Sequence, residues 1–208
     1  MYTITKIEAQ KKDDKRSSVF INDQYDFGVT TKSIERYGLK EGMILNEEEY
    51  ENLLRRIQLD KAKYCALEYL SRNQKTEKQI REQLLKHEYN ERIIEEVVTF
   101  LKTYHYIDDM EFAKRYIESK AVYGRKSSRY IQSQLYLKGI SQVNPMEVWH
   151  SLEEVEQENI IYFLDKYHYK KQLDYNQKRK IINRILNKGF SYEMIKKCID
   201  KLDESFEV

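Results

Sequence analysis

A segment of eleven residues recurs three times along the chain, and its period limits what the chain can fold into. The copies align without gaps at spacings of 51 and 50 residues: QIREQLLKHEY (Gln79–Tyr89), YIQSQLYLKGI (Tyr130–Ile140) and KIINRILNKGF (Lys180–Phe190). Similar apolar residues recur at equivalent positions, namely Ile80, Ile131 and Ile181, and then Leu84, Leu135 and Ile185. Such a period is typical of helical repeat proteins, in which each unit is too small to bury its own apolar face.

Start signals precede two of these repeated helices. Thr76 and Gln79 have the spacing of a capping box, and Ser127 takes the place of Thr76 in the second copy. Further segments with helical periodicity flank each copy. Those before the copies are Asp60–Ser71, Met110–Tyr123 and Val155–Tyr167, and those after them are Glu91–Thr103, Pro145–Glu153 and Tyr192–Leu202.

The ends of the repeated helices differ in one copy. Gly139 and Gly189 stand where a helix would end in a left-handed turn, a conformation that glycine adopts without strain. The first copy has Glu88 at this position. We therefore expect the first repeated helix to end in a differently built turn.

The residues before the repeats follow a different pattern. Thr3–Ala9, Ser18–Asp23 and Tyr25–Thr30 are short runs rich in β-forming residues, and Asn22-Asp23-Gln24 between the last two favours a hairpin. A small antiparallel sheet needs a helix to cover one face. We expect such a sheet at the N-terminus.

A helical segment connects this sheet with the repeats. Asn46 and the three glutamates after it predict a helix start, with this helix ending near Arg56 and another beginning at Asp60. The sequence therefore predicts a mainly α chain of tandem three-helix repeats in an elongated curved array, with a small N-terminal antiparallel β element. The expected parts are a β-rich element (1–45), a linking helix (46–59) and three repeats (60–107, 108–153 and 154–204).

The composition agrees with a helical chain and bears on its compartment. One proline, six glycines and 35% charged residues favour long amphipathic helices. No run of about 18 apolar residues occurs, so no membrane span is expected. Cys65 and Cys198 stand alone, which argues against a disulfide framework or a zinc site and favours the reducing cytoplasm.

Candidate catalytic groups are few. Asp108-Asp109 is the most tempting pair, but Asp108 and Glu111 have the spacing of N-cap and N3 residues, so helix capping explains the pair better. No phosphate-binding glycine motif occurs. The histidines have no cysteine or carboxylate at ligand spacing; they are His87, His105, His150 and His168. We expect no enzymatic activity, no metal and no cofactor.

Charge is distributed unevenly along the chain. The net charge is only +2, yet residues 112–140 hold seven cations and one anion, and residues 165–188 hold eight cations and two anions. Residues 141–164, between them, carry five glutamates and no lysine or arginine. These two basic windows fall on equivalent parts of the second and third repeats. In a stacked array they could therefore lie along one surface.

Two interpretations of the basic windows stay open. The cations could attract the phosphates of a nucleic acid, or they could form a solvated face with ion pairs between neighbouring turns. The candidates for contact with a partner or with DNA are Lys114, Arg115, Lys120, Arg125, Lys126, Arg129, Lys138, Lys178, Arg179, Arg184 and Lys188.

The order of these motifs resembles the RecX regulatory protein family. The matching pieces are ALEYLSRNQKTEKQIREQLLKHEY (Ala66–Tyr89), YIDDMEFAKRYIESK (Tyr106–Lys120) and RKSSRYIQSQLYLKGI (Arg125–Ile140). The third repeat and the N-terminal ITKIEAQKK fit the longer members, so the resemblance covers nearly the whole chain. The sequence departs from the family pattern at Glu88, where a glycine is usual, and at Tyr123-Gly124-Arg125, where the basic-glycine joint is ordered differently.

The resemblance implies a negative regulator of the RecA recombinase. Such proteins lie in the helical groove of the RecA–single-stranded DNA filament, where they hinder its growth or promote its disassembly. Strand exchange, ATP turnover and repressor co-cleavage then fall, which links the chain to recombination, DNA repair and the SOS response. The implied partner is the RecA filament on single-stranded DNA, direct contact with the DNA is left open, and we expect a cytoplasmic monomer.

Two other functions fit the residues themselves. The basic windows would also suit a helical-repeat nucleic-acid-binding module that acts independently of RecA. Tight and strongly salt-dependent binding to bare DNA would favour that function. Alternatively, the repeats form a scaffold for another protein and the cations only keep it soluble, in which case a pull-down would recover a partner other than RecA.

Overall fold

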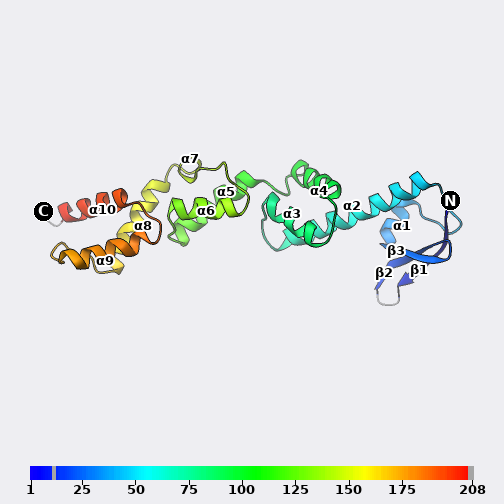
Figure 1. Ribbon diagram of the computed structural model, residues 1–208, viewed down its shortest axis with the longest axis horizontal. Helices are drawn as coiled ribbons and strands as arrows, with labels where there is room; N and C mark the ends of the chain where they lie inside the picture. Colours follow the sequence, from blue (N-terminus) through cyan, green and yellow to red (C-terminus); the bar gives the residue numbers. More distant parts are fainter. Residues whose placement is uncertain (11–12, 206–208) are drawn as a thin grey trace. The chain divides into compact units, whose positions relative to one another are not determined.

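The computed structural model describes residues 1–10 and 13–205 (Figure 1). The chain divides into two compact units, of which the first comprises Met1–Arg72 and Glu82–Phe100 and the second comprises Asn73–Arg81 and Leu101–Val208. Helices dominate both units, and the strands are confined to the N-terminal part of the first. The predicted mainly α chain with a small N-terminal antiparallel sheet is confirmed.

The sheet has four antiparallel strands in the order β3-β2-β1-β4. Its strands are β1 (Tyr2–Gln10), β2 (Asp13–Ile21), β3 (Gln24–Thr30) and β4 (Ile44–Leu45). Asn22 and Asp23 connect β2 with β3, and both have positive φ angles, of 49° and 67°. Two successive left-handed residues are the requirement of a type I′ turn, and the predicted hairpin is therefore confirmed.

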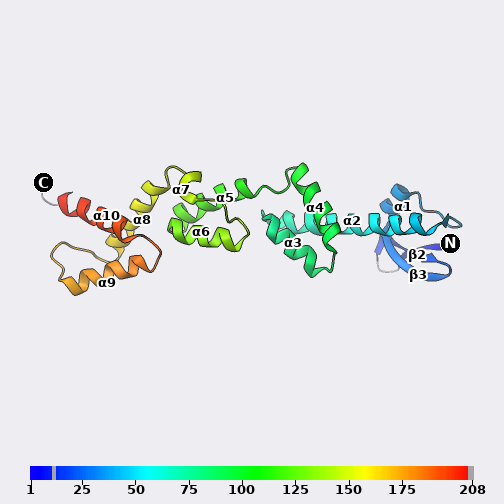
Figure 2. The same ribbon diagram turned by 45° about the horizontal axis from the view of Figure 1, so that its top comes forward.

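Two helices, α1 (Thr31–Tyr37) and α2 (Glu47–Arg72), lie next to the sheet (Figure 2). Ile4 and Val19 of the sheet are completely buried and belong to one core with Leu53 and Ile57 of α2. Helix α1 is absent from the sequence-based prediction, because its seven residues include no buried apolar stripe. Its start depends on Thr30, whose hydroxyl accepts a hydrogen bond from the Ser33 N–H at 3.1 Å.

Helix α2 is continuous over 26 residues, and the predicted break between Arg56 and Asp60 is wrong. The expected boundary between residues 59 and 60 thus falls inside one helix. Asp60 resembled a cap, but its carboxylate accepts hydrogen bonds from the Arg36 guanidinium at 2.8 Å and from the Tyr37 hydroxyl of α1. Burial, and then this hydrogen bond to Asp60, raise the pKa of Tyr37 to about 12.

The remaining helices follow the predicted periodicity with two differences. They are α3 (Glu77–Lys86), α4 (Glu91–Thr103), α5 (Asp109–Glu118), the π-helix η1 (Ser119–Tyr123), α6 (Ser128–Leu137), α7 (Pro145–Val148), α8 (Leu152–Lys166), α9 (Tyr175–Leu186) and α10 (Tyr192–Ser205). The helix predicted at Met110–Tyr123 changes to a π-helix at Ser119. The helix predicted at Pro145–Glu153 ends at Val148, because Trp149 has an extended backbone.

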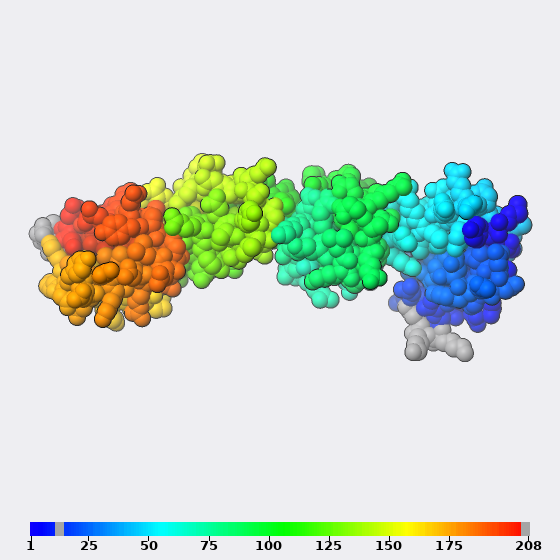
Figure 3. Space-filling view, in the orientation of Figure 1, coloured from blue at the N-terminus to red at the C-terminus, as the bar shows by residue number. Residues whose placement is uncertain are grey.

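The three repeated segments form α3, α6 and α9, and their aligned apolar positions are buried. The buried side chains are Ile80, Leu84, Ile131, Leu135, Ile181 and Ile185. In the second unit, the buried residues of α6 and those of α9 belong to two separate cores. One core gathers α5, α6 and the Leu152 side chain from the first turn of α8, and the other gathers α8, α9 and α10. Figure 3 shows α9 and α10 (orange and red) closely packed.

The end of α3 corrects a second expectation. Glu88 itself adopts the left-handed conformation, with a φ angle of 60°. The equivalent glycines, Gly139 and Gly189, have φ angles of 89° and 91°. The hydrogen bonds also correspond, because Tyr89 N–H donates to the Leu84 carbonyl just as Ile140 N–H donates to the Leu135 carbonyl. The first repeated helix therefore ends in the same turn as the second, built with glutamate in place of glycine.

Candidate nucleic-acid interface

The second unit contains two matching contacts between repeated helices, here called joints. In the second joint, the Ser127 hydroxyl at the start of α6 accepts a hydrogen bond from Tyr130 N–H (3.2 Å) and donates one to the Lys188 carbonyl after α9 (3.1 Å). In the first joint, the Thr76 hydroxyl before α3 donates to the Lys138 carbonyl after α6 at 2.8 Å. Each predicted cap residue therefore also binds the next repeat.

A carboxylate completes each joint. Asp109 accepts a hydrogen bond from Glu77 N–H at 2.9 Å, and Glu156 accepts one from Ser128 N–H at 2.5 Å. Asp108 caps its own helix, as predicted, whereas Asp109 caps the start of α3 in the preceding repeat. Burial raises the pKa of both the Asp109 and the Glu156 carboxyl.

The two glycines at the joints allow the backbones to approach closely. A Cβ on Gly139 would lie 2.7 Å from the Lys78 Cβ, and a Cβ on Gly189 would lie 2.4 Å from the Ser127 Oγ. Glu88 shows that a side chain tolerates this backbone conformation. The absence of a Cβ at Gly139 and Gly189 is therefore required by the contact between repeats, and the turn alone does not require it.

A cavity of about 450 Å³ lies at the second joint, and it is here called the joint groove. Its lining residues are Gly124, Arg125, Lys126, Arg129, Tyr130, Ser133, Phe163, Asn187, Lys188 and Gly189. Arg125, Lys126 and Arg129 come from the first basic window, and Lys188 comes from the second. The packing of the joint thus brings cations that are more than 50 residues apart to one concave surface.

The backbone before α6 places Arg125 and Lys126, whereas Arg129 lies in the first turn of α6. The π-helix η1 ends with a hydrogen bond from Gly124 N–H to the Ser119 carbonyl, and in the turn after it Lys126 N–H donates to the Lys120 carbonyl at 2.9 Å, six residues back. Arg125 has a φ angle of 46°, which is uncommon for a residue other than glycine. Short π-helices and left-handed residues are frequent at functional sites. This irregular turn carries Arg125 and Lys126 to the groove.

Aromatic rings lie beneath three of the four cations of the joint groove. The Arg125 guanidinium lies 4.1 Å from the centre of the Tyr162 ring, and the Lys126 ammonium lies 5.0 Å from that of Tyr130. Lys188 lies over Phe163 at 4.7 Å. Attraction to the ring faces holds the charged groups at the groove surface.

The other predicted residues lie outside this groove. Arg115 pairs with Glu111 of the preceding turn at 2.8 Å, which is the ordinary solvated ion pair that the second interpretation predicted. Four more cations lie over aromatic rings; they are Lys120, Lys138, Lys178 and Arg184. Lys114 and Arg179 are exposed. The structure therefore brings four of the eleven candidates together.

Some lining residues were not predicted from the sequence. Phe163 packs beside Tyr167, with ring centres 6.0 Å apart, as Phe112 packs beside Tyr116 at 5.8 Å. Phe163 and Tyr167 stand 51 residues after Phe112 and Tyr116, which is the repeat spacing. The sequence therefore contained a signal for this aromatic pair. Tyr130, Ser133 and Asn187 gave no comparable signal, because only the joint brings them to the same surface.

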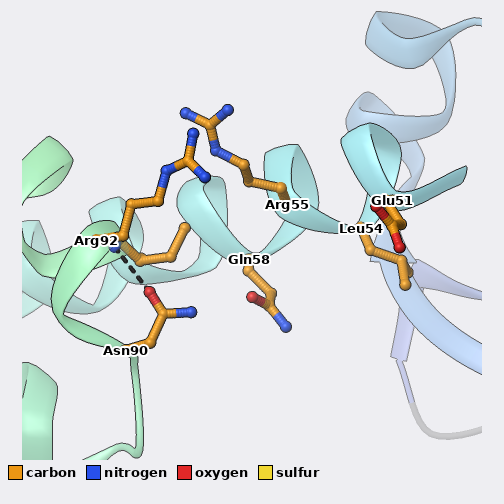
Figure 4. A pocket seen from close by; sticks show the side chains of 7 residues that line it. Glu51, Leu54, Arg55, Gln58, Asn90 and Arg92 are labelled. Atoms are coloured by element: carbon orange, nitrogen blue, oxygen red, sulfur yellow. Dashed lines mark hydrogen bonds between the residues drawn. The ribbon is translucent and has the colours of Figure 1, made fainter. Parts of the chain in front are cut away.

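A second cavity, of about 250 Å³, lies in the first unit between α2 and the start of α4 (Figure 4). The Arg55 and Arg92 guanidinium groups point to the same side of it. Arg55 already binds Glu96 at 2.5 Å, and Asn90 accepts a hydrogen bond from Ile93 N–H at 3.0 Å. These groups are engaged in folding contacts, and the joint groove is the stronger candidate.

The described residues offer neither a metal site nor a membrane span. Within residues 1–10 and 13–205, no group of three or more histidine, cysteine, aspartate or glutamate side chains could hold a metal ion. Over the same ranges no helix has the length and apolar character to cross a bilayer.

Comparison with known proteins gives one consistent family. The model described as "Regulatory protein RecX N-terminal domain" matches residues 2–46, and that described as "RecX, first three-helix domain" matches residues 62–101. The regulatory protein RecX of Bacillus cytotoxicus is 31% identical over 98% of this chain and 78% of its own length. That of Clostridioides difficile is 32% identical over 97% of this chain and 96% of its own.

Solved structures agree with the sequence matches. A crystal structure of regulatory protein RecX is similar with a TM-score of 0.70 and 28% identity, over 95% of this chain and all of that one. The crystal structure of RecX from Lactobacillus salivarius has a TM-score of 0.61 and 25% identity, over 70% of this chain and 96% of its own. Since the similarity extends along nearly the whole sequence, this chain belongs to the RecX family of regulatory proteins.

Proposed function

We propose that this chain regulates homologous recombination and the SOS response by binding the RecA–single-stranded DNA filament and inhibiting its growth and activity. Membership of a regulatory family supports the proposal. The structural observation that supports a mechanism is the joint groove, where cations from the two basic windows lie together. A filament of protein on DNA presents repeated phosphates, which such a groove would attract.

The proposal includes the cellular setting and the state of the protein. The chain would act as a monomer in the cytoplasm. Both cysteine thiols, Cys65 and Cys198, are free, which fits a reducing compartment. The division into three repeats also remains part of the proposal, with the joints as the contacts between them.

The proposal is tested by adding the protein to preformed RecA filaments on single-stranded DNA. ATP turnover and filament length should both fall at stoichiometric protein. The informative variant reverses three groove charges together, Arg125→Glu, Lys126→Glu and Arg129→Glu. Because like charges facing each other cost several kcal/mol, the half-inhibitory concentration should rise about tenfold or more.

The control must change the charge equally without touching the joints. Lys78 is unsuitable, because its ammonium donates to the Leu137 carbonyl at 3.0 Å and its side chain packs on Gly139. A better control reverses three exposed cations elsewhere in the second unit, Lys170, Lys180 and Lys196. Full inhibition by the groove variant, or equal loss in the control, would remove the groove from the mechanism.

A second function rests on the same groove. A nucleic-acid-binding module independent of RecA is favoured by the lack of ion-pair partners for the groove cations among the described residues. The two functions differ in one measurement. Inhibition that needs RecA and is far stronger than binding to bare DNA supports the regulator, whereas tight binding to bare DNA with no effect on RecA supports the module.

A further inference from the structure

The joint groove gathers four cations without an acidic residue among them. Some other cations of the chain, such as Arg36, Lys102 and Lys197, lie within 4 Å of a carboxylate. None of the residues that line the groove is acidic, and its four cations make no ion pair within the described ranges. Four like charges are thus held together without a counterion from the protein, and an external anion would relieve their repulsion.

Three of the four groove cations also rest on aromatic rings. Arg125, Lys126 and Lys188 each lie over an aromatic ring of α6 or α8, so their long side chains are partly ordered before any ligand arrives. Ordering a flexible side chain on binding costs about 0.5–1.5 kcal/mol. A site whose cations are already placed loses less of this free energy when it binds an anion.

The lining favours a polyanion with flat, uncharged parts. Ser133 and Asn187 add neutral hydrogen-bonding groups beside the cations, and Tyr130 lines the groove with 38% of its surface exposed. A single strand of nucleic acid offers a phosphate at every residue and an unpaired base that can stack on a tyrosine. An acidic peptide offers the charges but no flat ring, and a duplex keeps its base faces inside.

We propose that the joint groove binds the phosphodiester backbone of single-stranded nucleic acid. Its phosphates lie against Arg125, Lys126, Arg129 and Lys188, and a base lies against Tyr130. This assignment rests on the proposed function and deepens it, because it names the DNA strand as the part of the filament that this surface contacts. The site is composite, since Lys188 reaches it only through the contact of Ser127 with the residues around Gly189.

The full-length protein is titrated into a fluorescent oligo(dT) of about 15 nucleotides, close to the site size of single-strand-binding domains. Fluorescence anisotropy is measured at several salt concentrations from about 50 to 200 mM. Lys188→Gln and Arg129→Gln should each weaken binding about tenfold, the effect of removing one charged hydrogen bond. Each should also reduce the slope of log K against log salt by about 0.7, the loss of one phosphate contact.

Two further variants separate the parts of the site. Tyr130→Leu should weaken binding and leave the salt slope unchanged, because it removes stacking but no charge. Lys180→Gln, an exposed change of equal charge on α9, should bind like the unchanged protein. Equal affinity of all variants, competition by polyglutamate as strong as by unlabelled oligo(dT), or tighter binding of a matched duplex would each overturn the assignment.

The same variants are assayed for inhibition of RecA ATP turnover, which separates this site from the proposed function. If the protein binds oligo(dT) through the groove but never inhibits RecA, the site stands and the proposed function fails. If the protein inhibits RecA while the groove variants bind oligo(dT) as tightly as the unchanged protein, the proposed function stands and the site is refuted.

Discussion

At the scale of single residues, several side chains do two tasks at once. Ser127 and Thr76 cap their own helices and donate to the backbone of the next repeat. A hydroxyl can do both because it is donor and acceptor, whereas a carboxylate or a carbonyl can only accept. Asp109 and Glu156 then serve the same helix starts from the other repeat. The backbone N–H groups at the start of a helix thus find hydrogen-bond acceptors in the neighbouring repeat as well as in their own cap residue.

The buried carboxylate of Glu156 leads to a prediction about pH. Burial raises its pKa above the ordinary glutamate value, so the folded state takes up a proton more readily than the unfolded chain. This group therefore costs stability as pH rises from the ordinary value through the raised one. Glu156→Gln keeps an oxygen that accepts from Ser128 N–H and carries no charge. The variant should gain stability relative to the unchanged protein as pH increases.

Urea unfolding between about pH 4 and pH 8, followed by the fluorescence of Trp149, measures this difference. Trp149 is the sole tryptophan of the chain and packs against the core that contains α6. Glu158→Gln, an exposed change on the same helix, serves as a control for the loss of one negative charge. Parallel pH profiles for Glu156→Gln and the unchanged protein would show that the carboxyl titrates normally.

At the scale of helices, the structure shows why the glycines of the repeats are not interchangeable with other turn residues. The left-handed turn itself is available to Glu88, His105 and His168, each of which ends a helix with a positive φ angle. Of the three helices aligned by the repeat, only those that dock on a preceding repeat end in glycine. The requirement is imposed by a neighbouring helix, and a sequence pattern within one helix does not reveal it.

Gly189→Ala tests this requirement. The new Cβ would lie 2.4 Å from the Ser127 Oγ, so Ser127 must move and its hydrogen bond to Lys188 is lost. We expect a loss of about 1–3 kcal/mol from this overpacking, in addition to the cost of the positive φ angle. In a Ser127→Ala background the Oγ is absent, and the same substitution should cost less. The coupling free energy of this double-mutant cycle, obtained from urea unfolding, isolates the steric contact. Additive effects of the two changes would show that the turn alone requires glycine.

At the scale of the whole molecule, the second unit is held together by helix α8, which contributes side chains to two hydrophobic cores. The first turn of α8 places Leu152, which is completely buried, in the core around α6. The rest of α8 supplies Ile160 and Phe163 to the core around α9. One helix thus links two cores, and the expected boundary between residues 153 and 154 lies within it. The second and third repeats should therefore lose structure together.

Leu152→Ala tests this cooperation by hydrogen exchange. Removing a fully buried leucine side chain costs about 2–5 kcal/mol. Amide exchange should accelerate in α6 and in α9, because both depend on the position of α8. Leu85→Ala, at a side chain that is 53% exposed, should leave both helices unchanged. Faster exchange in α6 alone would mean that the two repeats open independently.

Much of this organisation was predictable from the sequence, and the failures have definite causes. The repeat was readable because Ile80, Ile131 and their equivalents must be buried in every copy. The caps were readable because Ser and Asp act within three residues of their own position. Asp60 wrongly predicted a helix start, because an aspartate can also accept hydrogen bonds from side chains of another helix. The joints were not readable, since Ser127 and Lys188 are 61 residues apart in a repeat of about 50.

The joint groove could be predicted from the sequence only in part. The two basic windows correctly suggested that cations of different repeats lie on one surface. Which of the eleven would meet depended on the turn at Arg125 and on the close approach at Gly189, and neither is expressed in charge or periodicity. Phe163, the ring beneath Lys188, carried the repeat spacing but lacked any mark that distinguished it from ordinary core residues.

The joints also determine where a row of such helices can stop. A middle helix can receive a neighbour at its C-terminal end only if that end has no side chain in the way, and α3 has Glu88 there. It can reach the next helix only through a hydroxyl at its start, but α9 begins at Asp174, whose carboxylate is engaged in a capping box with Gln177. The end of α3 and the start of α9 therefore lack the groups that make the two joints. In helical repeat proteins, terminal units that differ from the inner ones keep the array soluble.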